Sequence, residues 1–489
     1  MELLLGFFCI IIALVIAGVV VADLLKGRPI LTVRNFFFGG LLIFQTTSAA
    51  VSFFLGNYGE IPPANPGSSG LVYVGLLVVF LTGFVVVYSK GWFRFGLDRR
   101  LATSFPSPNS PTLVLLAFVL LLLACVFRFV LVYIPIFNIL CVMIAPALAS
   151  AACATVCWAW SRHMKNPAYI TAVGVIVLAA FAIAVYQQFG RRDATSVMLA
   201  CVWGAFHGGL KFIDWRRAFI PLVGLSAAAL VVVAALTASR TEKQTELGVT
   251  DIINRLFSAK IGVGIVDIFS GQQAAPNSMW LIENRPENAP YDTLHSAVYT
   301  ITMPMPRTIW DQYFVTPKPS ALGLTMVPEV GITRKSPGYN VGPGLIGHIW
   351  NDNPFLALPL YTIGLAVLVR LLDDRVSSLP DNPFSVIPAG VALGEIVAIP
   401  RGELGLFFFR TMLAVSSAII AMWLLAKVLA ACGVQIRAED GSALVRRRGA
   451  EIDDDPLQDP RLAAEYAGEG DHSPIESSEN GAYDTPARG

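Results

Sequence analysis

Long apolar stretches separated by short polar connections make up most of this 489-residue chain. A helix needs about 20 apolar residues to cross the hydrocarbon core of a bilayer. Eleven stretches approach that length, and the seventh and tenth are the weakest. They are 3–22, 34–56, 71–89, 112–133, 135–160, 169–188, 196–212, 218–238, 355–372, 384–400 and 404–431. This pattern predicts an all-α polytopic membrane protein with about 11 transmembrane helices.

The composition agrees with this pattern and excludes an ordinary soluble protein. Charged residues make up 14% of the chain, against about 25% in an average soluble domain. The net charge of +1 gives no signature of nucleic-acid binding. The first apolar stretch lacks the basic start of a signal peptide and is too long for one. We therefore interpret it as the first spanning helix.

Lysine and arginine are concentrated in every second connection, which predicts the orientation of the chain. Cytoplasmic loops of membrane proteins carry an excess of these residues. The alternation places the N-terminus outside and the C-terminus in the cytoplasm. The basic positions are Lys26, Arg28, Lys90, Arg94, Arg99, Arg100, Arg162, Lys165, Lys211, Arg216, Arg217, Arg370, Arg375, Arg437, Arg446, Arg447 and Arg448.

Two segments differ from the apolar pattern. Residues 239–354 form a long external connection with several tryptophans and many prolines, and we expect short helices packed over the membrane domain there. Residues 433–489 are acidic and rich in Gly, Ser and Pro, which predicts a disordered cytoplasmic tail. The predicted organisation is therefore helices 1–8 in 1–238, the external loop in 239–354, helices 9–11 in 355–432, and the tail.

Familiar catalytic signatures are missing from the sequence. It contains no GxSxG, no HExxH and no GxxxxGK[ST] motif. Its seven cysteines lie in or beside apolar stretches and form no CxxC pair, so we interpret them as buried hydrophobic residues. We expect neither a bound metal nor another cofactor.

Basic residues on the predicted external side are the main candidate chemistry. The positive-inside rule disfavours them in short external loops, and an arginine within a span is costly. They could be interface anchors, or partners for Asp193, Glu395 and Glu403. As a set they favour an anion-binding cavity, because guanidinium binds two phosphate oxygens at once. The set is Arg128, Arg191, Arg192, Arg255, Arg307, Lys318, Arg334, Lys335, Arg401 and Arg410.

A few other residues are candidates for acid–base chemistry. Glu395 is the acidic residue that lies well inside a predicted span. It either closes the helix bundle through an ion pair or acts as an orienting or proton-accepting group in the cavity. His348 and His295 are predicted to be external, and each is either a surface residue or a general base. His207 is interpreted as a core histidine.

Four short motifs together resemble the bacterial oligosaccharide repeat-unit polymerases of the O-antigen polymerase (Wzy) type. The segment "TMPMPRTIWDQYFVTPKP" (302–319) resembles their "PR…W…KP" signature, and "SPGYNVGPGLIG" (336–347) resembles their "Y.NFG..G" segment. The turns "GRRDATSVML" (190–199) and "RGEL" (401–404) resemble two further family turns in the same order. The resemblance covers roughly 180–415. It departs at Val341, where the family has an aromatic residue, and at "EVGITRKSPG" (329–338).

The resemblance implies a metal-independent membrane glycosyltransferase with a GT-C-like fold in the bacterial cytoplasmic membrane. It would polymerise undecaprenyl-pyrophosphate-linked repeat units by block transfer on the outer face, in O-antigen, capsule or exopolysaccharide biosynthesis. Chain-length regulators and flippases would be its partners. Transfer to another acceptor, as by O-antigen ligases, and transport or export of polysaccharide or lipid-linked sugar are the alternatives.

The external residues then receive expected roles. Transfer needs cations for the lipid pyrophosphate and a base for the acceptor hydroxyl. The base is left open among Glu329, Asp311, His348 and Glu395. The expected catalytic residues are Arg191, Arg192, Arg307, Arg401, Glu329 and His348. The expected substrate-binding residues are Arg128, Arg255, Trp310, Lys318, Arg334, Tyr339, Asn340, Glu395 and Arg410.

Overall fold

The computed structural model describes a chain that is helical wherever it has regular secondary structure. It describes 1–26, 29–90, 107–134, 137–186, 191–212, 273–329, 331 and 341–432, with isolated positions at 224, 227, 231, 234, 235, 258 and 262. Within these ranges there is no strand. The predicted disordered tail lies outside them.

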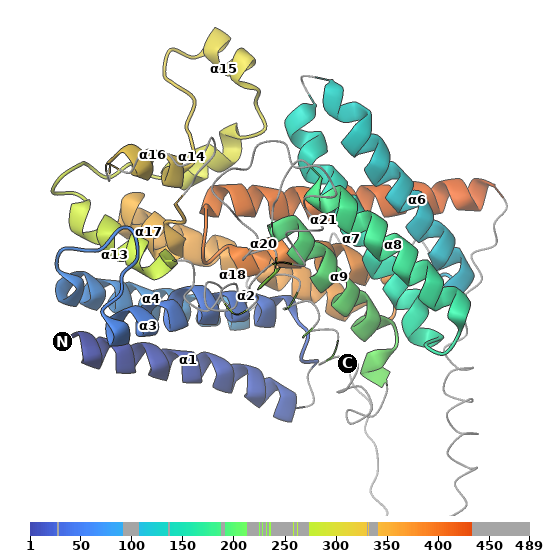
Figure 1. Cartoon of the computed structure of the whole chain (residues 1–489), viewed down its shortest axis with the longest axis horizontal. Coiled ribbons are helices and arrows are strands. Elements are labelled where there is room, and N and C mark those ends of the chain that lie inside the picture. The colour runs from blue at the N-terminus through green and yellow to red at the C-terminus, as the bar shows by residue number, and fades with distance from the viewer. Residues whose placement is uncertain are drawn as a thin grey trace, which may run out of the picture. The chain divides into compact units, whose positions relative to one another are not determined.

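Eight helices in this part of the chain are long and apolar enough to cross a membrane (Figure 1). This confirms a polytopic membrane protein. Two of them are composite: α2 (Val33–Leu41), the π-helix η1 (Leu42–Thr47) and α3 (Ser48–Leu55) form one, and α6 (Ser110–Phe129) with η2 (Leu131–Tyr133) forms another. The other six are α1 (Glu2–Leu25), α4 (Pro66–Lys90), α7 (Asn138–Arg162), α8 (Pro167–Val185), α18 (Pro354–Ser378) and α21 (Leu404–Ala431).

Three of the eleven predicted spans are not among these eight. The seventh is a helix, α9 (Arg191–Gly208), but it begins with three charged residues. The eighth, 218–238, lies mostly outside the described residues. The tenth is broken into α19 (Pro383–Val391) and α20 (Leu393–Ala398), which together are too short to cross a bilayer unaided.

Short helices occupy the described part of the long connection, as the sequence analysis expects. They are α13 (Ala274–Asn284), α14 (His295–Thr302), α15 (Arg307–Tyr313), α16 (Leu322–Glu329) and α17 (Gly344–Asn351). Three helices of the connection, α13, α14 and α17, pack near the ends of α4, α18 and α21 (Figure 1). A separate short 3₁₀ helix, η3 (Leu210–Phe212), follows α9.

Small residues let the central helices approach closely. α7 is buried along most of its length and packs between α6 and α9. Its inner face is rich in alanine, and a Cβ added at Gly204 of α9 would stand 2.1 Å from the carbonyl oxygen of Ala154. At Gly40 of α2 the same added atom would stand 2.3 Å from the carbonyl oxygen of Val397 in α20. Such contacts between small residues are typical of helix packing in membranes.

Hydrogen bonds fix the two ends of the bundle. At one end Tyr58 donates to Glu2 at the start of α1, with 2.7 Å between the oxygens. At the other, the carboxylate of Asp373 in α18 accepts the first two backbone N–H groups of α2, from Val33 at 2.7 Å and Arg34 at 3.1 Å. The Asp373 carboxylate thus satisfies the helix start that would otherwise leave donors unpaired. The first end is the predicted external end.

Close packing at Gly204 generates the first prediction. Gly204→Ala forces α7 and α9 apart, and we expect it to lower the free energy of unfolding by about 1–3 kcal/mol, the usual cost of overpacking. The matched control is Gly174→Ala in α8, where an added Cβ meets nothing within 4 Å. Sodium dodecyl sulfate titration of both variants in mixed micelles measures the difference. Equal stability of the two variants would contradict the close contact.

Candidate functional site

A turn between α20 and α21 organises the predicted external end. The carbonyl of Pro400 accepts from Leu345 N at 3.0 Å and from the side-chain amide of Gln45, and that of Arg401 accepts from Gly344 N at 3.1 Å. Gln45 belongs to the π-helix η1 and in turn accepts from the Tyr73 hydroxyl at 2.7 Å. The turn is therefore fastened to α17 and to two spanning segments.

Glu403 closes this turn, and its carboxyl group is buried. One carboxylate oxygen accepts from Leu322 N at 3.1 Å and the other from Gly323 N at 2.5 Å. These are the first two N–H groups of α16, so Glu403 caps that helix. Burial raises the pKa of Glu403 to about 7, although the two N–H groups favour its ionised form. Glu403 is thus poised to exchange a proton near neutral pH.

His348 lies on α17 beside Glu403 and is completely buried, so it is not a surface residue. Its Nε2 accepts from Leu404 N at 3.3 Å and lies 3.6 Å from a Glu403 oxygen. Its Nδ1 lies 2.7 Å from the Ser296 hydroxyl oxygen, and with Nε2 accepting, Nδ1 carries the proton and donates to it. Burial lowers the pKa of His348 to about 3, which keeps the imidazole neutral.

Asp352 extends this buried polar group toward α18. Its carboxylate accepts from Ser296 N at 2.7 Å, from the Asn351 amide at 3.0 Å and from the Tyr361 hydroxyl. Burial raises the pKa of Asp352. The buried polar cluster, defined as Ser296, His348, Asp352, Tyr361 and Glu403, joins α14, α17, α18 and the start of α21.

A large cavity lies on another side of α14. Its volume is about 870 Å³, and η2, the start of α7, α14, α15 and 318–324 line it. Tyr299, Arg307 and Lys318 are among the lining residues. Burial and the charge of Glu403 raise the pKa of Tyr299 to about 12, while Arg192 and Arg307 oppose that rise. Tyr299 is therefore a neutral phenol, and the charges of Glu403 and Arg307 both act on it.

The cavity contains two cations whose charge is not neutralised. Lys318 Nζ donates to the carbonyl oxygens of Met303 at 3.3 Å and Met305 at 2.5 Å. Burial and the charge of Arg307 lower the pKa of Lys318. No carboxylate of the described chain pairs with Lys318 or Arg307. Two cations in one cavity without acidic partners favour an anionic ligand.

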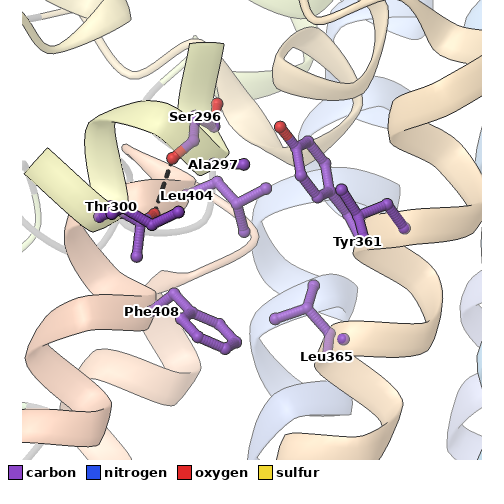
Figure 2. Close-up of a pocket in the computed structure, with 10 residues that line it drawn as sticks. Ser296, Ala297, Thr300, Tyr361, Leu365, Leu404 and Phe408 are labelled. Atoms are coloured by element: carbon purple, nitrogen blue, oxygen red, sulfur yellow. Dashed lines mark hydrogen bonds between the residues drawn. The ribbon is translucent and has the colours of Figure 1, made fainter. Parts of the chain in front are cut away.

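A smaller apolar slot of about 220 Å³ lies between α14, α18 and α21 (Figure 2). Leu365, Leu404 and Phe408 line it, and Ser296 and Tyr361 of the buried polar cluster border it. Thr300 Oγ1 donates to the Ser296 carbonyl at 2.7 Å, which holds the wall formed by α14. The slot suits an alkyl or prenyl chain better than a sugar.

The arginines expected inside the bundle are mostly neutralised there. Arg410 pairs with Asp193 of α9 and, at 2.7 Å, with Glu395 of α20. All three side chains are nearly buried, so this ion triad ties α9, α20 and α21 together. The pair with Arg410 is the bundle-closing ion pair that the sequence analysis gives as one role of Glu395.

Arg128, Arg192 and Arg401 also interact with groups of the protein. The guanidinium of Arg128 is buried, donates to the Tyr186 carbonyl and lies 5.7 Å from that tyrosine ring. Arg192 lies 4.7 Å from the centre of the Phe407 ring, and its charge acts on Glu395. Arg401 is half-buried in the turn described above. Arg191 begins α9, and its side chain lies outside the described part of the structure.

Among the other expected site residues, Glu329 forms an ion pair with Arg285 at 2.8 Å, which makes it poorly suited as a free base. Trp310 packs on Phe314 and donates from its indole to Thr316. Asp311 is exposed on α15. Arg255, Arg334, Tyr339 and Asn340 lie outside the described residues.

Glu403, Tyr299 and Ser296 are residues of this region that the sequence does not indicate as site residues. Glu403 stands in the "RGEL" turn, where the sequence predicts only a partner for an arginine. Tyr299 lies four residues before the start of the "MPMPR" segment, and its closeness to that motif is the signal in the sequence that could have indicated it. No pattern in the sequence marks Ser296.

The ion triad generates the second prediction. Arg410→Met leaves two buried carboxylates without a counter-ion, and we expect it to lower the free energy of unfolding by about 3–5 kcal/mol. Arg370→Met removes the more exposed pair with Asp374 and should cost about 1 kcal/mol. Detergent titration measures both. Adding Asp193→Asn and Glu395→Gln to Arg410→Met should restore part of the loss, and no restoration would argue against the triad.

Comparison with family models, with curated proteins and with solved structures finds no match to this chain.

Proposed function

We propose that this protein transfers an oligosaccharide from a lipid pyrophosphate to a sugar hydroxyl, as an oligosaccharide repeat-unit polymerase with undecaprenyl-pyrophosphate-linked substrates. The observation that carries the proposal is the cavity of about 870 Å³ with two unneutralised cations, Arg307 and Lys318, next to Tyr299 and the buried Glu403. The motif resemblance adds the substrate class to this chemistry.

The cations act on the leaving group. The acceptor oxygen attacks the anomeric carbon of the first sugar, and the bond from that carbon to the pyrophosphate oxygen breaks. Negative charge then develops on the lipid pyrophosphate. Arg307 offers a fork of N–H donors to it and Lys318 a point charge, and such preorganised donors stabilise a transition state strongly.

Glu403 accepts the proton of the acceptor hydroxyl. A base works best when its pKa lies near the working pH, and the pKa of Glu403 of about 7 meets that condition. The carboxyl is buried and does not line the cavity, so we propose that the proton reaches it through the hydroxyl of Tyr299, which lines the cavity and whose pKa the charge of Glu403 raises. His348 then has a positioning role, since it stays neutral and holds Ser296 and the Leu404 amide beside Glu403.

The third prediction concerns pH. Only the ionised Glu403 accepts a proton, so the rate of glycan transfer at saturating substrate should rise from pH 5.5 to 8 with a midpoint near the pKa of about 7. Glu403→Gln should lower the rate by about 10² or more and remove this rise. Glu403→Asp keeps a carboxyl and should retain a rise at a reduced rate. If Glu403→Gln transferred glycan at the full rate and with the same pH profile, Glu403 would not be the general base.

The fourth prediction concerns the cavity cations. Arg307→Gln should lower transfer by about 10²-fold, because one preorganised donor group is lost. Arg307→Lys keeps the charge but loses the fork, so its loss should be smaller. The control is Lys165→Gln, an exposed lysine at the other end of α7. The assay is the product ladder formed by purified protein with lipid-linked repeat units in proteoliposomes.

The products also separate the alternatives. A polymerase yields a ladder of longer lipid-linked glycans. Glycan appearing only on a different acceptor indicates a ligase-like transferase. If unmodified repeat units instead cross the membrane of the proteoliposome, the protein is a transporter and the proposed site is wrong.

A further inference from the structure

An arm with an apolar tip leaves the helices of the predicted external end. The arm is defined as residues 303–320, with α15 at its far end, and Figure 1 draws it on two connections that leave α14 and return toward α16. Val315 at the tip is fully exposed, Tyr313 is 72% exposed, and Phe314 and Ile309 are also exposed. Four large apolar side chains on one projection call for a covering surface.

The arm holds its own shape. The rings of Trp310 and Phe314 stack with their centres 4.1 Å apart, and the indole N–H donates to the Thr316 carbonyl at 2.8 Å. At its base, Lys318 joins the returning connection to the carbonyls of Met303 and Met305. The apolar tip is therefore presented by packed side chains and fixed hydrogen bonds.

The apolar surface of the spanning helices continues toward this arm. Ile301 of α14 is 78% exposed and borders the apolar slot together with Leu360 of α18 and Phe408 of α21. Phe355, in the first turn of α18, is 84% exposed. Ile301 is two residues from the start of the arm, so lipid that covers α18 and α21 also reaches the arm's base.

We propose that the arm docks into the headgroup region of the lipid bilayer at this end of the protein. Its composition fits that place, because aromatic residues and cations gather where a membrane protein crosses the interface. Trp310, Tyr313 and Phe314 lie beyond Arg307, and Lys318 follows them. A second copy of the chain fits less well, since four side chains are far fewer than the 20–30 residues that a stable interface contributes per side.

Docking of the arm has a consequence for access to the cavity. Arg307, Ile309 and Lys318 belong to the arm and line the cavity of about 870 Å³. A docked arm sets this wall at the level of lipid phosphates. If the proposed function holds, an amphiphilic substrate enters from the bilayer without passing through water. The docking itself does not depend on that function.

A fluorescent label at the tip tests the proposal. Val315→Cys is labelled with a nitrobenzoxadiazole dye in a background with Cys125→Ala and Cys432→Ser, because the other cysteines are buried. The full chain is reconstituted in phosphatidylcholine–phosphatidylglycerol vesicles. We expect blue-shifted emission, quenching by lipids spin-labelled near the headgroup, and weak quenching by iodide.

The matched control is Glu287→Cys, at an exposed polar position after α13. Its label should emit as in water and be quenched several-fold more by iodide than the tip label. Phe314→Asp combined with Tyr313→Ser should shift the emission of the tip label toward that of the control. Thermal unfolding checks that each variant folds.

Two outcomes would overturn the proposal. Equal iodide quenching at positions 315 and 287, without quenching by spin-labelled lipid, would place the tip in water. A blue shift that disappears when the protein is diluted with excess lipid would mean that a second copy covers the tip. Neither outcome depends on glycan transfer, so docking and the proposed function fail independently.

Discussion

The cost of removing charge from water governs the arrangement of this protein. Burying an unpaired charge or backbone donor among apolar helices costs free energy, so buried groups of this kind favour a partner within the chain. Arg410 meets this need with Asp193 and Glu395, and Asp373 meets it at the start of α2. These polar contacts join segments far apart in sequence and so set which helices are neighbours.

The same constraint accounts for the chemistry at the turn before α21. Glu403 is buried, yet two N–H groups at the start of α16 support its carboxylate. Burial and hydrogen bonding oppose each other, and the balance brings its pKa to about 7. Burial instead lowers the pKa of His348 to about 3, so its imidazole stays neutral. Glu403 in the turn therefore titrates near neutral pH, whereas its neighbour His348 on α17 does not.

Local pattern predicted the spans well, because a long apolar stretch needs no partner to be recognised. Local pattern failed where the placement of a charged residue depends on a partner that is distant in the sequence. At the start of α9, Asp193 pairs with Arg410 of α21, and Glu395 pairs with the same Arg410, fifteen positions away. The capping of α16 by Glu403 joins residues about 80 positions apart, and no local pattern indicates such a contact.

The cations of the external end fall into two groups with different consequences. The guanidinium groups of Arg128, Arg192 and Arg410 interact with a carbonyl, a ring or a carboxylate of the protein itself. Arg307 and Lys318 have no carboxylate partner in the described chain and face open volume. Arg307 is exposed and Lys318 is half-buried, so neither charge needs a carboxylate partner within the fold, and both are open to an anion in the cavity. The cavity beside α14, rather than the arginine-rich bundle, is therefore the place to look for the proposed anionic leaving group.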